Sequence, residues 1–574
     1  MSAPLLHIDR LSVKFDTAEV EAVKDLSLEL YQNQTLAIVG ESGSGKSVTA
    51  LSILQLISSA HVKYPQGHIW FSPEGGERTD LLSEPLQQLR STRGAKISMV
   101  FQEPMTSLNP VLTCGEQVAE AIQAHENISR QNVKQRVIEL FTRVELPDPD
   151  TIYRKYPHQL SGGQKQRVMI AMAMSTNPLL LICDEPTTAL DVTVQKSIIA
   201  LIHKLQAETK MAVIFISHDL ALVSDIATHI AVMYQGQLVE YGEAGSLIHA
   251  ASHPYTRALL ACRPANHPKS QRLPVVGDFI KVKQLKTDVV TGETNMASTT
   301  VKGPALSPQS MTIQTTPLVS GTHIGVEFRG PRGMKFNAVD DVTIVIGRGE
   351  TVGLAGGSGS GKTTLGRALL RLVPTTAGTI NFDGMDITSL QASRIRNLRS
   401  RMQLIFQDPY SSLNPRIRIG EAIMEAMQAH KKITRSNAKN EIIVLLEKVG
   451  LGSEHFMRYP HEFSGGQRQR VVIARALSLK PEFIVCDESV SALDVSVQAQ
   501  VINLLNDLKK EFGFSALFIS HDLALLRYVS DRLYIMHQGK IVEEGLTEAV
   551  YDKPAHPYTR ELISSIPGSK LSGR

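Results

Sequence analysis

The sequence lacks any long apolar run. None of its apolar stretches approaches the roughly 18 residues that a membrane-spanning helix needs. The first ten residues contain Asp9 and no extended apolar stretch, so we expect no secretory signal there. The net charge is only +4, which predicts no strong attraction to nucleic acid or lipid from charge alone. We therefore expect a cytoplasmic protein that reaches a membrane only through partners.

Cysteine is also scarce. The four cysteines, Cys114, Cys183, Cys262 and Cys486, lie far apart and form no Cys-x-x-Cys pair, so a cysteine metal site is not expected. Cys183 and Cys486 lie inside apolar runs, where cysteine acts as a small buried apolar residue. With 574 residues, the chain is too long for one hydrophobic core and is expected to fold as two to four domains.

What the sequence does contain is a duplication. Four short patterns each occur twice, and the last three pairs are separated by the same 303 positions. The patterns are GESGSGKS at 40–47 with GGSGSGKT at 356–363, SGGQ at 161–164 and 464–467, CDE at 183–185 and 486–488, and SHD at 217–219 and 520–522. A constant offset over several patterns indicates a duplicated domain.

The duplication sets the expected domain boundaries. Residues 1–265 form the first copy and residues 321–574 the second. Residues 266–320 between them are rich in Ser, Thr, Pro and Gly and show no helical or strand period, which predicts a flexible linker. For residues 275–282, packing on a domain surface is an equal alternative.

Short apolar runs alternate with amphipathic stretches in each copy. Residues 35–39 lead into the first glycine loop, residues 179–182 precede Asp184, and residues 212–216 precede His218. Buried strands that alternate with helices predict an α/β fold with a mixed, mostly parallel sheet in each copy. Helical patterning between residues 110 and 160, and again between 415 and 462, predicts a helical subdomain in each.

The glycine loops have the pattern of a phosphate cradle, Gly-x-x-x-x-Gly-Lys-Ser/Thr between a strand and a helix. The glycines allow backbone N–H groups to face phosphates, and the helix N-terminus adds a favourable dipole. We expect Lys46 and Lys362 to reach the β- and γ-phosphates, and Ser47 and Thr363 to bind Mg²⁺. The other loop residues expected at the nucleotide are Gly40, Ser42, Gly43 and Gly45, and Gly356, Ser358, Gly359 and Gly361.

An Asp-Glu pair follows a buried strand in each copy. Asp184 and Asp487 are expected to bind the Mg²⁺, directly or through water. Glu185 and Glu488 are expected to orient and polarise the water that attacks the γ-phosphate. A solvated acid at a strand end is the simpler alternative, but four apolar residues precede each pair.

The SGGQ segments each precede a strongly helical stretch. Ser161 and Ser464 are expected to cap these helices, while Gly163 and Gly466 expose the first N–H groups to an anion. Each copy already has one phosphate loop. We therefore expect this second anion site to bind the γ-phosphate of a nucleotide held by the other copy.

Together these patterns resemble the ATP-binding cassette (ABC) ATPases, in which SGGQ is the signature. The resemblance places Gln102 and Gln407 at the Q-loop, near nucleotide and Mg²⁺, and His218 and His521 at the switch histidine that contacts the γ-phosphate. It also places Phe15 and Phe328 where the family stacks an aromatic ring on adenine, although core packing explains a single Phe equally well.

A narrower resemblance is to the oligopeptide/dipeptide/nickel importer branch. It rests on QEPMTSLNP at 102–110, QDPYSSLNP at 407–415, and HPYTR at 253–257 and 556–560. The chemistry of the HPYT tails is open, and surface packing is their simpler reading. The fused two-cassette arrangement is most similar to the glutathione-importing members. Gly357 in place of Glu41, Phe463 in place of the usual Leu, and Ser489-Val490 in place of Pro186-Thr187 remove no expected ligand.

The resemblance implies a function. The chain is expected to be the ATPase of a bacterial ABC importer for glutathione or other short peptides, with ATP and Mg²⁺ bound between head-to-tail cassettes. Its expected partners are two transmembrane permease subunits and, through them, an external solute-binding protein, at the cytoplasmic face of the inner membrane. The alternatives are a dipeptide, oligopeptide or, less favoured, nickel importer, and a soluble twin-cassette ATPase acting on ribosomes.

Overall fold

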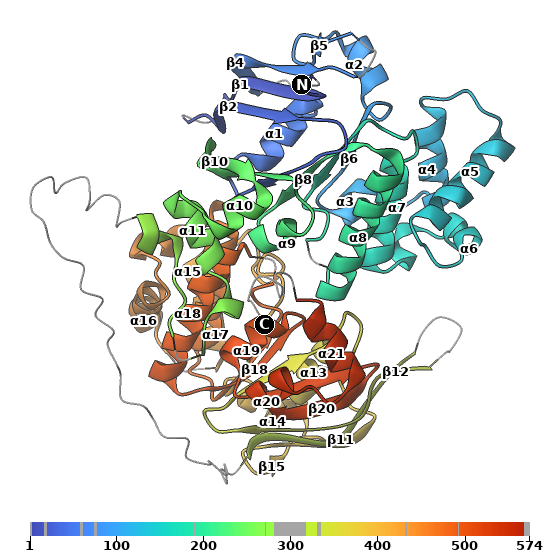
Figure 1. Cartoon of the computed structure of the whole chain (residues 1–574). Coiled ribbons are helices and arrows are strands. Elements are labelled where there is room, and N and C mark those ends of the chain that lie inside the picture. The colour runs from blue at the N-terminus through green and yellow to red at the C-terminus, as the bar shows by residue number, and fades with distance from the viewer. Residues whose placement is uncertain are drawn as a thin grey trace, which may run out of the picture. The chain divides into compact units, whose positions relative to one another are not determined.

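The computed structural model describes residues 3–16, 20–57, 61–73, 77–188, 190–269, 271–280, 317–329, 335–430, 433–491 and 493–566. Contacts between Cα atoms divide the chain into two compact units. Unit 1 comprises Met1–Arg263, Asp494–Ser496 and Ser564–Arg574, and unit 2 comprises Pro264–Leu493 and Val497–Ile563. Each unit contains one complete copy of the predicted α/β core (Figure 1).

The centre of unit 1 is a six-stranded sheet in the order β10-β9-β3-β8-β7-β6. Its strands are β3 (Thr35–Val39), β6 (Ile97–Val100), β7 (Leu180–Asp184), β8 (Ala212–Ser217), β9 (His229–Tyr234) and β10 (Gln237–Glu243). All neighbours are parallel except β10, which pairs antiparallel with β9. Every residue of β3, β7 and β8 is buried, as expected for strands covered on both faces. The predicted mixed, mostly parallel sheet is confirmed.

A second, antiparallel sheet shares the core of unit 1. Its order is β2-β1-β4-β5, with β1 (Leu6–Phe15), β2 (Val23–Leu30), β4 (Val62–Phe71) and β5 (Thr79–Asp80). Leu28 of this sheet, Ile38 of β3 and Ile53 of helix α1 (Lys46–Ile53) belong to one hydrophobic cluster. Helix α1, which follows the first glycine loop, therefore shares its core with residues of both sheets.

The predicted helical subdomain of unit 1 is also present. It contains α3 (Pro104–Ser107), α4 (Cys114–Gln123), α5 (Arg130–Arg143), α6 (Pro149–Arg154), η1 (Pro157–Gln159) and α7 (Gly162–Ala173). In Figure 1 the helices α4, α5 and α6 gather beside α7. The remaining helices of unit 1 are α2 (Leu86–Thr92), α8 (Val192–Thr209), α9 (Leu220–Ser224), α10 (Ala244–His249) and α11 (Pro254–Ala261).

Unit 2 repeats the same plan. Its six-stranded sheet runs β16-β17-β18-β13-β19-β20 and its antiparallel sheet β12-β11-β14-β15. The strands are β11 (Pro317–Arg329), β12 (Lys335–Gly347), β13 (Thr351–Ala355), β14 (Ala377–Phe382), β15 (Met385–Asp386), β16 (Met402–Ile405), β17 (Phe483–Asp487), β18 (Ser515–Ser520), β19 (Arg532–His537) and β20 (Lys540–Leu546). The helices are α13 (Lys362–Leu369), α14 (Ala392–Leu398), α15 (Ile419–His430), α16 (Arg435–Lys448), η4 (Ser453–Met457), η5 (Pro460–Glu462), α17 (Gly465–Leu477), α18 (Val495–Phe512), α19 (Leu523–Val529), α20 (Thr547–Asp552) and α21 (Pro557–Ser564).

The chain leaves unit 1 at Arg263 and packs at once on unit 2. η2 (Pro264–Asn266) contacts α19, and Leu273 is 1% exposed. The Leu273 N–H donates to Asn503 Oδ1 at 3.0 Å, and Asn503 Nδ2 donates to the Leu273 carbonyl at 2.8 Å. Of the predicted linker, residues 270 and 281–316 lie outside the described residues, and the predicted boundaries stay predictions. The described part before them has defined contacts, including the buried Val276 in the stretch for which surface packing was an alternative.

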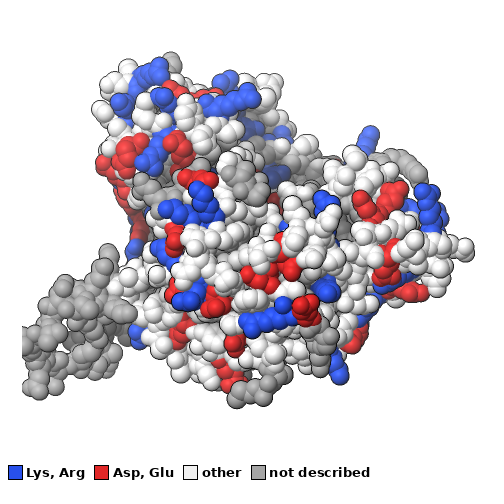
Figure 2. Space-filling model, turned by 90° about the horizontal axis from the view of Figure 1, so that it is seen from above, with Lys and Arg blue, Asp and Glu red and all other residues white. Residues whose placement is uncertain are grey.

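The structure shows where the four cysteines lie. All four cysteines are buried and free, and Cys183 and Cys486 lie in β7 and β17 as predicted. Within the described ranges, no helix is long and apolar enough to cross a membrane. Over the same residues, no group of three or more His, Cys, Asp or Glu side chains is arranged to hold a metal. Positive and negative side chains are interspersed over the face shown in Figure 2.

Candidate nucleotide sites

Each predicted phosphate loop joins a buried strand to a helix. In unit 1 the loop runs from β3 to α1, and Gly45 has φ +100° at the helix start. A Cβ on Gly45 would lie 2.6 Å from the carbonyl oxygen of Ala22, so only glycine fits there. Gly361 has φ +103°, and its Cβ would lie 2.2 Å from the Ala338 oxygen. Both loops are therefore fixed against the start of a strand of the antiparallel sheet.

The loop lysines point back into their own loops. Lys46 Nζ donates to the carbonyl oxygens of Gly40 at 2.8 Å and Glu41 at 2.9 Å. Lys362 Nζ makes the same two bonds, to Gly356 and Gly357, each at 2.8 Å. Lys46 is only 4% exposed, and this burial lowers its pKa. The exposed residues of the loops are Ser42, Gly43, Ser358 and Gly359.

The predicted Mg²⁺ ligands lie side by side in both units. Ser47 Oγ donates to Asp184 Oδ1 at 3.0 Å, and Thr363 Oγ1 donates to Asp487 Oδ1 at 2.8 Å. Burial raises the pKa of each aspartate, and the hydroxyl hydrogen bond opposes that rise. A hydroxyl and a carboxylate are hard oxygen ligands of the kind that Mg²⁺ takes, so the residues present fit this ion.

Glu185 is held by three side chains. Gln102 Nε2 donates to Glu185 Oε2 at 3.0 Å, Thr188 Oγ1 donates to the same oxygen at 2.9 Å, and His218 Nδ1 lies 3.5 Å away. Burial alone would raise the pKa of Glu185, but the hydrogen bond and charge of His218 and the charge of Lys46 outweigh burial and lower it to about 2. Burial would lower the pKa of His218, and Glu185 raises it instead.

Glu488 has a similar setting with one difference. Gln407 Nε2 donates to Glu488 Oε2 at 2.8 Å, and His521 Nδ1 lies 3.6 Å from Glu488 Oε1. Ser491, which takes the place of Thr188, donates to the main-chain oxygen of Glu488 at 2.9 Å rather than to its carboxylate. The two glutamates thus share the glutamine and histidine contacts, whereas the hydroxyl contacts of Thr188 and Ser491 differ.

The signature serines cap their helices as predicted. Ser161 Oγ accepts from the Gln164 N–H at 3.3 Å, and Gln164 Oε1 accepts from the Ser161 N–H at 3.1 Å, which is a capping box. Ser464 and Gln467 repeat both bonds at the same distances. Ser161 and Ser464 are exposed, so each capped helix start lies at the surface of its own cassette.

The signature glycines are required by close packing. A Cβ on Gly163 would lie 2.7 Å from Val194 Cγ1 of α8, and a Cβ on Gly466 would lie 2.4 Å from Val497 Cγ1 of α18. The helix start therefore approaches the following long helix more closely than any larger residue would allow.

The aromatic residues differ between the copies. Phe328 is 45% exposed and faces Phe336, 60% exposed, across the β11–β12 ladder. Phe15 ends β1 and is half-buried. An exposed pair of rings in unit 2 is suited to stacking on a base. Phe336 was not singled out from the sequence, because only strand pairing shows that it faces Phe328.

Two tyrosines of the HPYT tails were also missed. The Glu41 N–H donates to Tyr255 Oη at 2.9 Å, and the Gly357 N–H donates to Tyr558 Oη at 2.8 Å. Tyr255 and Glu41 are 214 positions apart, so no local pattern could reveal the contact. The only sequence signal for a shared role of these tyrosines is the repeat of HPYT after both cassettes.

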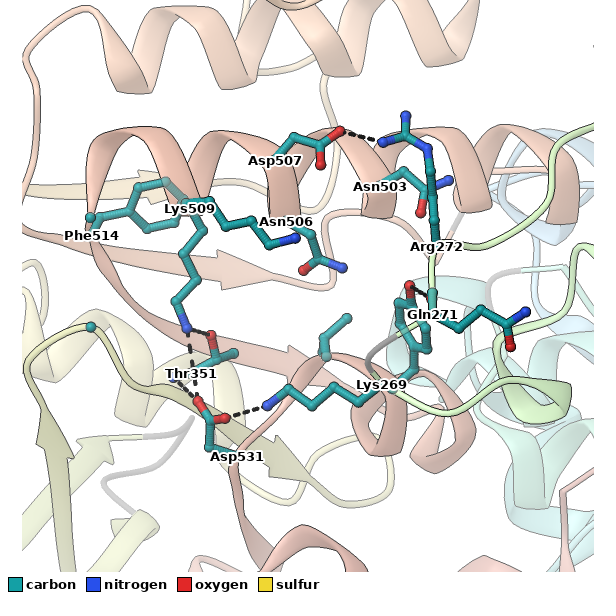
Figure 3. A pocket seen from close by; sticks show the side chains of 15 residues that line it. Lys269, Gln271, Arg272, Thr351, Asn503, Asn506, Asp507, Lys509, Phe514 and Asp531 are labelled. Atoms are coloured by element: carbon teal, nitrogen blue, oxygen red, sulfur yellow. Dashed lines mark hydrogen bonds and ion pairs between the residues drawn. The ribbon is translucent and has the colours of Figure 1, made fainter. Parts of the chain in front are cut away.

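A large pocket of unit 2 lies away from the phosphate loop. Its volume is about 890 Å³. Figure 3 shows Asp531 between Lys269 and Lys509, to which it is ion-paired, and Arg272 paired with Asp507 at 2.7 Å. None of its lining residues is a predicted nucleotide-site residue. The pocket is formed where the chain after Arg263 packs on α18 of the same unit.

Comparison with known proteins shows the family of the chain. Residues 23–188 and 339–491 match the ABC transporter family, and residues 239–281 and 542–572 match the oligopeptide/dipeptide transporter C-terminal region. The chain is 46% identical to the glutathione import ATP-binding protein GsiA of Shigella sonnei and to that of Escherichia coli, over 99% of this chain and 90% of theirs. Among solved structures, the chain is similar to a dimeric ATP-binding cassette bound to ADP and Pi. The match covers 40% of this chain and 98% of that one, with 24% identity and a TM-score of 0.37.

The chain belongs to the ATP-binding proteins of ABC transporters, with an oligopeptide/dipeptide transporter C-terminal region after each cassette. The family resemblance expected from the sequence is therefore confirmed. Proteins of this family hydrolyse ATP to power transport, and this chain is the ATP-binding subunit of such a transporter.

Proposed function

We propose that this chain energises a bacterial importer of glutathione, with glutathione preferred over other short peptides. Glutathione as the substrate is supported by 46% identity, over 99% of the chain, to proteins named for glutathione import. The C-terminal regions after both cassettes support peptide import more generally. A dipeptide or oligopeptide is the second candidate substrate, and nickel is less favoured.

The proposed chemistry uses one set of side chains in each cassette. Lys46 and Lys362 leave their loop carbonyls to bind the β- and γ-phosphates of ATP. Glu185, whose lowered pKa keeps it ionised at neutral pH, and Glu488 orient and polarise the attacking water. His218 and His521, beside these carboxylates, contact the γ-phosphate.

Mg²⁺ is proposed as the metal of both sites. Ser47 with Asp184, and Thr363 with Asp487, would hold it, with Gln102 and Gln407 as further ligands. When bound, the ion neutralises charge that develops on the phosphate oxygens. The two glutamines donate to Glu185 and Glu488 in this structure, so each can link the metal site to the carboxylate that orients water.

Completion of each site is proposed to need both cassettes. Ser464 and Gly466 would complete the site of Lys46, and Ser161 and Gly163 that of Lys362. The exposure of the helix starts at the signatures supports this arrangement, because the dipole of a helix favours an anion near its N-terminus. Phe15 and Phe328 are proposed to contact the adenines.

The proposed partners are two transmembrane permease subunits, which bind beside the Q-loops and carry the chain to the cytoplasmic face of the inner membrane. Large apolar side chains next to Gln102 and Gln407 support this surface. Phe101 is 37% exposed, Phe406 is 41% exposed and Tyr410 is 51% exposed. An external solute-binding protein would deliver the substrate to the permease.

Reconstitution tests the proposal directly. The chain is assembled with its two permeases in vesicles, and ATP turnover is measured with the binding protein loaded with glutathione, a dipeptide or nickel. We expect glutathione to stimulate turnover most. Stimulation by a dipeptide alone would support the second candidate. Stimulation by ribosomes, with no response to any loaded binding protein, would contradict an importer.

A further inference from the structure

One peptide unit at the start of each phosphate loop is held from both ends. The Gly40 carbonyl accepts from Lys46 Nζ at 2.8 Å, while the N–H of the same peptide unit, on Glu41, donates to Tyr255 Oη at 2.9 Å. In unit 2 the Gly356–Gly357 peptide is held in the same way by Lys362 and Tyr558, at 2.8 Å on each side. The HPYT tyrosine thus lies one peptide unit from the lysine that reaches the phosphates.

The tail positions this tyrosine through its own backbone. Pro254 opens α11, and His253 caps the helix by accepting the Tyr255 N–H on Nδ1 at 3.2 Å. Glu240 of β10 accepts the N–H groups of Ser252 at 2.7 Å and His253 at 3.2 Å. The tail is thereby fixed to the edge strand of the sheet that carries the phosphate loop.

Unit 2 repeats this arrangement. His556 Nδ1 accepts the Tyr558 N–H at 3.2 Å, and Glu543 of β20 accepts the N–H groups of Ala555 at 2.7 Å and His556 at 3.0 Å. The first three residues of HPYT therefore each have a role: the histidine caps, the proline opens the helix, and the tyrosine reaches the loop.

The ring and the hydroxyl of each tyrosine make different contacts. Tyr255 is 0% exposed and its ring centroid lies 4.3 Å from that of Tyr234, while the Tyr558 ring lies 4.0 Å from that of His537. These ring contacts would survive replacement of tyrosine by phenylalanine. The hydroxyl alone supplies the acceptor for the loop N–H, so the two contributions can be separated by experiment.

We propose that Tyr255 and Tyr558 are positioning residues for ATP, whose hydroxyls hold the first peptide unit of each phosphate loop in the orientation that the bound nucleotide requires. Without the hydroxyl, an empty loop can turn this N–H toward water. The occupied cradle must hold the same N–H without a partner, so the loss falls mainly on the bound state. The C-terminal tails are by this account part of the ATP sites.

The test uses the full chain carrying Glu185→Gln and Glu488→Gln, so that ATP is retained. Binding of a fluorescent ATP analogue with Mg²⁺ is compared before and after adding Tyr255→Phe and Tyr558→Phe together. We expect the dissociation constant to rise about tenfold, the effect of leaving a partly buried N–H unpaired beneath the bound nucleotide. The Tm without nucleotide is expected to move by less than about 2 °C.

The matched control is Tyr234→Phe, which removes a neighbouring hydroxyl that does not contact the loop; it should leave binding unchanged. A dissociation constant within about twofold of the parent after both tyrosine changes would overturn the proposal. So would a loss of affinity accompanied by a fall of more than about 5 °C in the Tm without nucleotide, because the hydroxyls would then serve folding. The assay reads ATP binding and not transport, so its result is independent of which solute is imported.

Discussion

At the residue scale, Glu185 and Glu488 stand out by backbone as well as by chemistry. Their φ angles are +45° and +46°, in the left-handed region that residues other than glycine rarely adopt. Such a conformation costs on the order of 1–3 kcal/mol and persists where the surroundings impose it. Here the N–H groups of the two glutamates are tied to Ile216 and Ile519 of the neighbouring strands. In this conformation each carboxylate contacts the glutamine and histidine partners described above.

Replacing Glu185 or Glu488 by glutamine should slow hydrolysis at that site by about 10²-fold or more and leave ATP binding intact, because the amide cannot polarise water. Single-turnover hydrolysis and nucleotide binding are measured on the same samples. Glu447→Gln, an exposed residue of α16, serves as the control. Full turnover by the double variant would refute the assigned role.

Thr188 and Ser491 test whether the different hydroxyl contacts of Glu185 and Glu488 affect hydrolysis. Thr188→Val removes a hydroxyl from the Glu185 carboxylate and should slow single-turnover hydrolysis at that site by about 3–10-fold, the loss of roughly one hydrogen bond. Ser491→Ala, whose hydroxyl bonds to a main-chain oxygen, should change hydrolysis at the Glu488 site by less than about twofold. Equal effects of the two changes would show that the difference in hydroxyl contacts has no role in catalysis.

At the element scale, the loop-and-helix units are built the same way in both cassettes, and the described segment after Arg263 adds a connection packed on α18. Arg272 pairs with Asp507, and the amide of buried Asn503 exchanges two hydrogen bonds with the Leu273 backbone, as a strand partner would. The segment is therefore anchored to α18 by backbone bonds that do not depend on its irregular sequence.

Asn503→Leu should release this segment. Both backbone groups of Leu273 would lose their partner, at a cost of about 1–3 kcal/mol for each buried group. We expect trypsin to cleave after Lys269 and Arg272 at least about fivefold faster, measured by mass spectrometry. Asn397→Leu, at an exposed position of α14, is the control. Unchanged cleavage would show that the segment is anchored by other contacts.

At the scale of the whole molecule, the features that depend on a local sequence pattern could be predicted from the sequence. The run from Thr35 to Val39, followed by glycines and Lys46, predicts strand, loop and helix, because buried parallel strands are continuously apolar. The capping of α7 by Ser161 follows from the Ser-x-x-Gln spacing. Both features are present in the structure.

The parts that depend on distant contacts could not be predicted. Tyr255 reaches Glu41 across 214 positions, and Leu273 reaches Asn503 across 230. The left-handed backbone of Glu185 is imposed by neighbouring strands rather than by its own sequence. Tertiary packing, and not propensity, decides these features.

The central claim is that each ATP-binding site is completed by the signature segment of the other cassette. Vanadate trapping of a photoreactive ATP in the assembled transporter, followed by peptide mapping, tests this claim most directly. With Ser464→Arg, which places a bulky cation at the second signature, labelling near Lys46 should fall by about tenfold or more while labelling near Lys362 persists. Loss of labelling near Lys362 with labelling near Lys46 intact would contradict the account, because each cassette would then close its own site.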